Sequence, residues 1–189
     1  MKLCIIALSI LLWLLSPAVH AQKDLIVTAS TGYSLSAFEN QNSVAGSWPL
    51  SLSGAIEVAP QLEMGADVHL ALGGYAFDGE FFGQSITTTF RQHSVGAFVR
   101  YLLPLGSVSP FVRIGSGYYF GNSSYELFGH KQEEQVKGAF GLSVGAGILL
   151  TDHLNAEFIY NAVSRESDEQ KFDANTWMFL VGYRFILGS

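Results

Sequence analysis

The chain has 189 residues and a formal net charge of −6 at neutral pH. This length suits one domain, and the acidic balance argues against nucleic acid or an anionic leaflet as the main partner. Cys4 is the only cysteine and lies in the apolar N-terminal segment, so we expect a mature protein without a disulfide, a thiolate metal site or a thiol nucleophile.

The first 21 residues have the pattern of a secretory signal peptide. Lys2 precedes an apolar run over residues 3–15, and the small residues Val19 and Ala21 mark a cleavage site after Ala21. A retained anchor helix is the alternative, but Pro17 follows the run closely and the run is shorter than the ~20 residues that span a bilayer. We therefore predict a signal peptide over residues 1–21 and a barrel domain over residues 22–189.

Eight segments of the mature chain have strand character, and no helical period competes with them. The predicted strands cover residues 24–36, 50–59, 62–77, 86–103, 110–121, 135–151, 154–164 and 174–187. A closed single-chain outer-membrane barrel requires an even number of strands. We predict an all-β fold, an eight-stranded antiparallel up-and-down transmembrane β-barrel.

The alternation of side chains is clearest over residues 137–150, KGAFGLSVGAGILL. The even positions carry bulky apolar groups such as Phe140, Leu142 and Val144, whereas the odd positions carry Ala, Gly and Ser. A soluble sandwich places bulky residues toward its core and polar residues toward water. Large apolar groups opposite tiny ones indicate a strand that faces lipid on one side and a crowded lumen on the other.

The predicted connections alternate in length. Short turns over residues 60–61, 104–109 and 152–153 alternate with longer polar loops over residues 37–49, 78–85, 122–134 and 165–173. Short turns at one rim and long loops at the other are typical of the periplasmic and extracellular ends of such barrels. A soluble up-and-down barrel can share this alternation, but its outer face would carry charges, and the predicted lipid faces here carry none.

Charged residues of the predicted strands fall on the lumen parity. They are Glu57, Glu63, Asp67, His69, Arg100, Arg113, Glu157 and Arg184. An eight-stranded lumen is only wide enough for side chains, and an unpaired buried charge is unfavourable. We therefore predict a network of ion pairs and hydrogen bonds that plugs the lumen, with pore charges that select ions as the alternative.

Candidate catalytic and metal-binding residues do not form a recognisable site in the sequence. His93 and Ser94 are adjacent and so point to opposite faces of a strand, while His69 shares the lumen face with Asp67 but has no nucleophile near it in the chain. The acidic loop residues around His130 and after Arg165 lack calcium-loop spacing. We predict no catalytic residue, no cofactor and no metal site.

Two segments resemble a known family. Residues 107–121, SVSPFVRIGSGYYFG, and residues 141–161, GLSVGAGILLTDHLNAEFIYN, are similar to patterns of the OmpA/OmpX-like outer-membrane β-barrel family. The resemblance implies a Gram-negative outer-membrane barrel that the barrel-assembly machinery inserts. It also implies that Arg113 and Glu157 occupy places where family members carry lumen charges.

Three functional classes remain open at this stage. The leading expectation is a monomeric, non-enzymatic envelope scaffold whose extracellular loops meet lipopolysaccharide, host surfaces or other proteins. A conduit for small apolar molecules, similar to OmpW-like barrels, would need an open apolar lumen. A lipid A-modifying enzyme would need a His-x-Ser arrangement on one face, which the sequence lacks.

Overall fold

The computed structural model describes residues 24–37, 43–81, 84–103, 105–127, 130–167 and 170–188. The predicted signal peptide lies outside these residues, so its cleavage stays a prediction. No helix in the described part of the chain is long and apolar enough to cross a membrane.

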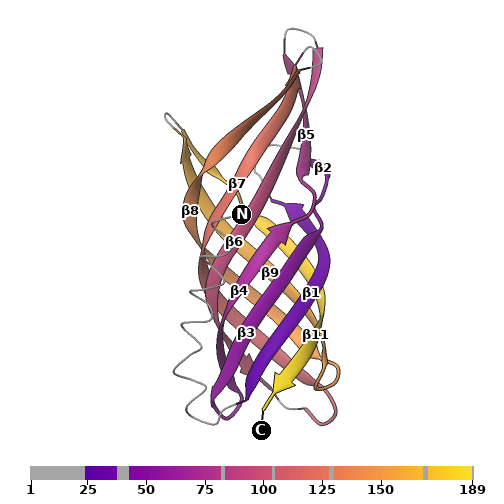
Figure 1. The fold of residues 1–189 in the computed structure, drawn as a ribbon, viewed down its shortest axis with the longest axis vertical. Helices are drawn as coiled ribbons and strands as arrows, with labels where there is room; N and C mark the ends of the chain where they lie inside the picture. The colour runs from indigo at the N-terminus through magenta and orange to yellow at the C-terminus, as the bar shows by residue number, and fades with distance from the viewer. Residues whose placement is uncertain are drawn as a thin grey trace.

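Eight strands form a closed antiparallel ring in the described residues (Figure 1). They are β1 (Leu25–Ser36), β3 (Pro49–Ala59), β4 (Leu62–Ala71), β6 (Gln84–Leu102), β7 (Ser109–Leu127), β8 (His130–Leu149), β9 (Leu154–Ser167) and β11 (Thr176–Leu187). Each pairs with the next in this order, and β11 closes the ring on β1. The predicted fold class is confirmed.

The closing seam between β1 and β11 is complete. Its register runs without a shift from Leu25 opposite Leu187 to Ser36 opposite Thr176. In lipid no water can satisfy a free backbone N–H or C=O, so a sheet can span a membrane only when its edges pair with each other. The continuous β1–β11 ladder meets this requirement.

Side chains alternate between the outside and the lumen as predicted. Along β11 buried and exposed residues alternate over ten positions. On β8, Phe140 is 80% exposed and Leu142 is 63% exposed, whereas Ser143 between Leu142 and Val144 is buried. The apolar residues thus face outward and the small or polar ones face inward, the arrangement of a membrane barrel.

The turns at the lower end of the barrel in Figure 1 are short, and the C-terminus lies at this end. Residues 60–61 join β3 to β4, and residues 150–153 join β8 to β9. Gln61 has a φ of 70° in the first of these turns, a conformation that few residues other than Gly, Asn and Asp adopt readily. By the rule for such barrels, this end is periplasmic.

At the upper end the predicted loops are wrong in large part, because strands continue through them. The β5 strand (Tyr75–Phe81) pairs with β6 as far as Phe81 opposite Gln84, and β7 pairs with β8 as far as Leu127 opposite His130. The strands β6, β7 and β8 have 19, 19 and 20 residues, about twice the 9–11 that cross a bilayer. Tall hairpins therefore rise above the barrel.

Two further short strands belong to this upper end. The β2 strand (Ser43–Ala45) pairs with β5, and β10 (Gln170–Asp173) folds back on β9. The predicted strand over residues 62–77 is interrupted after Ala71, where the backbone N–H of Ala71 donates to Nδ1 of His93 at 3.1 Å instead of continuing the ladder. The His93 imidazole thus occupies the break between β4 and β5.

Aromatic rings gather on the outer face at two levels. Trp177, near the upper end of β11, packs against Phe158 and Tyr160 with ring centroids 5.1 and 4.3 Å apart. Toward the lower turns, Tyr183 packs against Phe185 with centroids 4.9 Å apart. Amphipathic rings favour the headgroup level of a bilayer, so these contacts fit two aromatic girdles, one at each interface.

A lumen glycine provides a test of this packing. A side chain at Gly147 would meet the Phe111 ring and the backbone carbonyl of Ala156, so we expect Gly147→Val to destabilise the barrel by about 1–3 kcal/mol. The exposed neighbour Ala146 faces outward, and Ala146→Val should change the free energy of unfolding by less than about 0.5 kcal/mol. Urea unfolding of the refolded proteins, followed by tryptophan fluorescence, measures both values, and equal effects would contradict the assignment of faces.

Candidate functional site: a chain of ion pairs across the lumen

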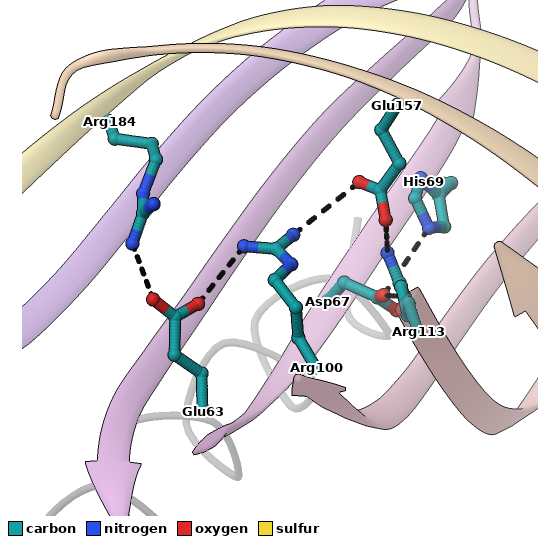
Figure 2. Close-up of polar contacts among 7 residues, drawn as sticks. All are labelled: Glu63, Asp67, His69, Arg100, Arg113, Glu157 and Arg184. Atoms are coloured by element: carbon teal, nitrogen blue, oxygen red, sulfur yellow. Dashed lines mark hydrogen bonds and ion pairs between the residues drawn. The ribbon is translucent and has the colours of Figure 1, made fainter. Parts of the chain in front are cut away.

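The lower half of the lumen is crossed by a continuous chain of charged side chains (Figure 2). In order of contact its members are Arg184, Glu63, Arg100, Glu157, Arg113, Asp67 and His69. They come from strands β4, β6, β7, β9 and β11, so the chain ties opposite walls of the ring together. We call this set the lumen ion chain.

One end of the lumen ion chain is centred on Glu63. Its Oε1 accepts a hydrogen bond from Nη2 of Arg184 at 2.6 Å, and its Oε2 accepts one from Nη1 of Arg100 at 3.1 Å. Three strand-to-strand steps separate Arg184 on β11 from Glu63 on β4 around the ring. The same separation holds for Arg100 on β6 and Glu157 on β9, whose Nη2 and Oε2 are 3.5 Å apart.

The other end is centred on Arg113. Its Nη1 donates to Oε1 of Glu157 at 3.3 Å, and its Nη2 donates to Oδ2 of Asp67. The same Asp67 oxygen lies 3.5 Å from Nε2 of His69. Each inner arginine therefore serves two carboxylates, and each of Glu63 and Glu157 serves two arginines.

The charges of the lumen ion chain balance. All its members are buried, with Arg100 and Glu63 each only 2% exposed. Three guanidinium groups meet three carboxylates, so with neutral His69 the set has no net charge. Buried charges are tolerated when they are paired and hydrogen-bonded, and an alternating chain satisfies this condition better than isolated pairs.

Two phenylalanine rings pack against the guanidinium groups of Arg100 and Arg113. The Arg113 guanidinium carbon lies 4.3 Å from the centroid of Phe98, and that of Arg100 lies 4.5 Å from the centroid of Phe111. Both rings are buried on the lumen face. A guanidinium over an aromatic face gains electrostatic attraction and is held in one orientation.

Glu57 was predicted as part of this network, and the structure corrects this. It lies opposite Glu63 in the β3–β4 register, but its side chain is exposed at the rim, where Oε1 accepts a hydrogen bond from the Gln61 backbone N–H at 3.0 Å. This bond supports the turn at the position of positive φ. Strand parity gave the correct face for Glu57 but not its depth in the barrel.

Among the described residues, two small cavities adjoin the Asp67–His69 end of the lumen ion chain. The larger offers about 20 Å³ to the centre of a water molecule and is lined by Ser34, Tyr75, Gln92 and Asn161 among others. The smaller offers about 10 Å³ beside Asp67 and Ser143. Cavities of this size hold about one water each.

The strand register also brings a serine next to a histidine and an aspartate that are far from it in the sequence. His69 on β4 lies directly opposite Ser94 on β6, and Asp67 follows on the same face, so serine, histidine and aspartate share the lumen wall. Nδ1 of His69 is buried with no hydrogen-bond partner in the described residues. The adjoining cavities have room for about one water molecule each and are far too small for an ester substrate.

A buried arginine outside the predicted set is Arg165. It was assigned to a loop, yet it lies on β9 and is 1% exposed. The polar residues that follow it in the sequence gave no sign of this burial. Among the residues that the structure describes, no group of three or more His, Cys, Asp or Glu could hold a metal ion.

A closed ring with an apolar exterior and a charge-balanced interior defines a small membrane-spanning barrel. The chain belongs to the family of the outer membrane protein beta-barrel domain, whose model matches residues 5–185. Proteins of this family reside in the outer membrane, in contact with its lipid and lipopolysaccharide, and the chain shares this location. The comparison with curated protein sequences gives no match.

Similar solved structures show the same fold. Neisserial surface protein A is 16% identical, with 86% of this chain and 96% of that chain covered and a TM-score of 0.53. A major outer membrane protein of Thermus thermophilus is 15% identical, with 87% and 99% covered and a TM-score of 0.50. The outer membrane enzyme PagL is also similar, at 14% identity, 85% and 98% coverage and a TM-score of 0.46. At such low sequence identity, the similarity shows a shared fold and nothing about a shared function.

Two glutamates that face each other across β3 and β4 test the lumen ion chain. Glu63→Ala leaves Arg184 without its carboxylate and removes one of the two from Arg100, so we expect a loss of about 3–5 kcal/mol in the free energy of unfolding. Glu57→Ala removes only a hydrogen bond at the rim and should lose no more than about 1 kcal/mol. Urea titration in detergent micelles measures both, and equal losses would show that the burial of Glu63 is immaterial.

Proposed function

We propose that the protein is a closed, non-enzymatic outer-membrane scaffold that presents its upper hairpins to the cell exterior. The observation that carries this proposal is the lumen ion chain, whose pairs join strands on opposite sides of the ring. An eight-stranded barrel has room for side chains and little else, and paired charges across that space leave no aqueous path for a solute.

Two other functions receive less support. A conduit for small apolar molecules needs an open apolar lumen, whereas this lumen contains three arginines and three carboxylates within hydrogen-bonding distance. A hydrolase could be built on Ser94, His69 and Asp67 only if a substrate reached them. The cavity there admits a water molecule, so the acyl group of a lipid has no place to bind.

The upper hairpins supply the surface that a scaffold would present. The β7–β8 hairpin continues in register from Gly121 opposite Val136 to Leu127 opposite His130. Residues 131–135 of this hairpin are all exposed, and Lys131 pairs with Glu133 at 2.9 Å. A long two-stranded arm with exposed polar side chains offers a broad surface to lipopolysaccharide or to proteins of another cell.

Conductance tests whether the lumen is closed. In a planar bilayer we expect the refolded wild-type protein to pass no steady current, because the lumen ion chain fills the interior. Arg113→Ala removes the arginine partner of Asp67 and one of the two arginine partners of Glu157, so this variant should leak or unfold. Arg184→Ala removes a single pair and should leak less. A steady wild-type current whose selectivity changes in either variant would make the protein a channel.

Shortening the β7–β8 hairpin tests the presenting surface. Replacement of residues 126–131 by Asn-Gly joins Tyr125 to Gln132 through a tight turn and leaves the pairing of β7 with β6 intact, so we expect the barrel to lose no more than about 1 kcal/mol. Cells that display the shortened protein should adhere to cultured host cells about tenfold more weakly than cells that display the wild type. Equal binding at equal surface display would remove this hairpin from the proposed function.

A further inference from the structure

Arg165 is a buried cation whose partners in the described residues are all uncharged. Nη1 donates to the Lys137 carbonyl oxygen at 2.7 Å, and Nη2 donates to Oε1 of Gln92 at 3.1 Å. Its Nε is buried and has no hydrogen-bond partner there, which is also true of Nε in Arg100, Arg113 and Arg184. The arginines of the lumen ion chain differ, because each of them has a carboxylate within 3.5 Å.

Arg165 lies just above the point where the described pairing of β8 and β9 ends. The β8 and β9 strands pair from Leu149 opposite Asn155 up to Gly141 opposite Val163, where their described pairing ends. Above this point β8 pairs with β7, and β9 pairs with β10, so the two strands diverge toward the upper end (Figure 1). Arg165 comes two residues after the last pair, at the base of this seam.

The described surroundings hold the guanidinium in place, and none of the described groups that contact it carries a negative charge. The Phe90 ring lies 5.5 Å from the guanidinium carbon, and Gln92 fixes one nitrogen while also lining the larger lumen cavity. Carbonyl dipoles replace only part of the hydration that a buried cation loses, so an anion is the partner that this site lacks. Lys137 on the facing strand contacts Arg165 through its backbone carbonyl, and its side chain is exposed.

We propose that Arg165 is the centre of an anion site in the seam between β8 and β9, and that the site binds a phosphate group. A guanidinium binds phosphate through several N–H groups at once, and the unpartnered Nε supplies one of them. The phosphate can belong to an outer-leaflet lipid that enters the seam from the side or to a soluble phosphate that enters from above. This site is independent of the closed lumen, because Arg165 contacts no member of the lumen ion chain.

The test follows the Nε–H signals of the five arginines in the full-length mature protein, labelled with ¹⁵N-arginine and refolded in a phosphate-free, uncharged detergent. Inorganic phosphate and dihexanoyl phosphatidic acid are added in separate titrations. We expect a saturable shift of the Arg165 signal, which is identified by its loss in Arg165→Gln. A shift with phosphatidic acid alone assigns the site to a lipid, and a shift with both assigns it to phosphate itself. No shift with either probe overturns the proposal.

Two variants separate binding from a purely structural bond between β8 and β9. Titration calorimetry with the probe that shifts the signal should give a dissociation constant about tenfold higher or more for Arg165→Gln, and one within about twofold for Arg91→Gln on the outer face of β6. If Arg165→Gln binds the probe as well as the wild type does, Arg165 only ties the two strands together and the proposal is wrong. An equal loss of affinity for the probe in both variants would also overturn the proposal, because binding would then depend on positive charge in general and not on Arg165.

Discussion

The structure depends on the closure of eight strands around a space that only side chains can fill. Because lipid satisfies no backbone polar group, the ladder must return on itself, and the β1–β11 seam completes it. Closure with this number of strands sets the radius of the lumen, and the radius decides which side chains can meet. Arg184 reaches Glu63 and Arg100 reaches Glu157 only because the walls three strands apart lie within the reach of two long side chains.

Much of this arrangement follows from the sequence, because the two faces of each strand meet different chemistry. The alternation of apolar and tiny residues on β8 predicted both the barrel and the direction of each side chain. Parity also found every member of the lumen ion chain. It placed Glu57 with them wrongly, since parity assigns a face but not a depth, and at the rim a carboxylate finds water and the Gln61 N–H instead of an arginine. Which arginine pairs with which carboxylate depends on the positions of their strands around the barrel, and the alternation of side chains along one strand does not give these positions.

The upper end was less predictable for a related reason. Above the membrane both faces of a strand meet water, so residues 122–134 are polar on both faces and have the composition of a loop. Their pairing comes from the continued register of β7 and β8, which holds beyond a bulge between Tyr119 and Gly121. Arg165 was assigned to a loop on the same grounds. Its burial depends on where the pairing of β8 with β9 ends and that of β9 with β10 begins. The sequence of neither strand shows where this change of partner occurs.

These two regions differ in whether carboxylates balance their buried arginines, and this difference bears on where the protein acts. In the lower lumen, carboxylates and arginines balance, so an added ion or solute would have to break existing pairs. Toward the upper end, Arg165 has only a backbone carbonyl and the Gln92 amide as hydrogen-bond partners in the described residues, just above the last described pair of β8 and β9. A buried cation without an opposite charge gains most from a new anionic partner. Recognition by this barrel is therefore expected at its upper end, with the balanced lower lumen as the rigid support.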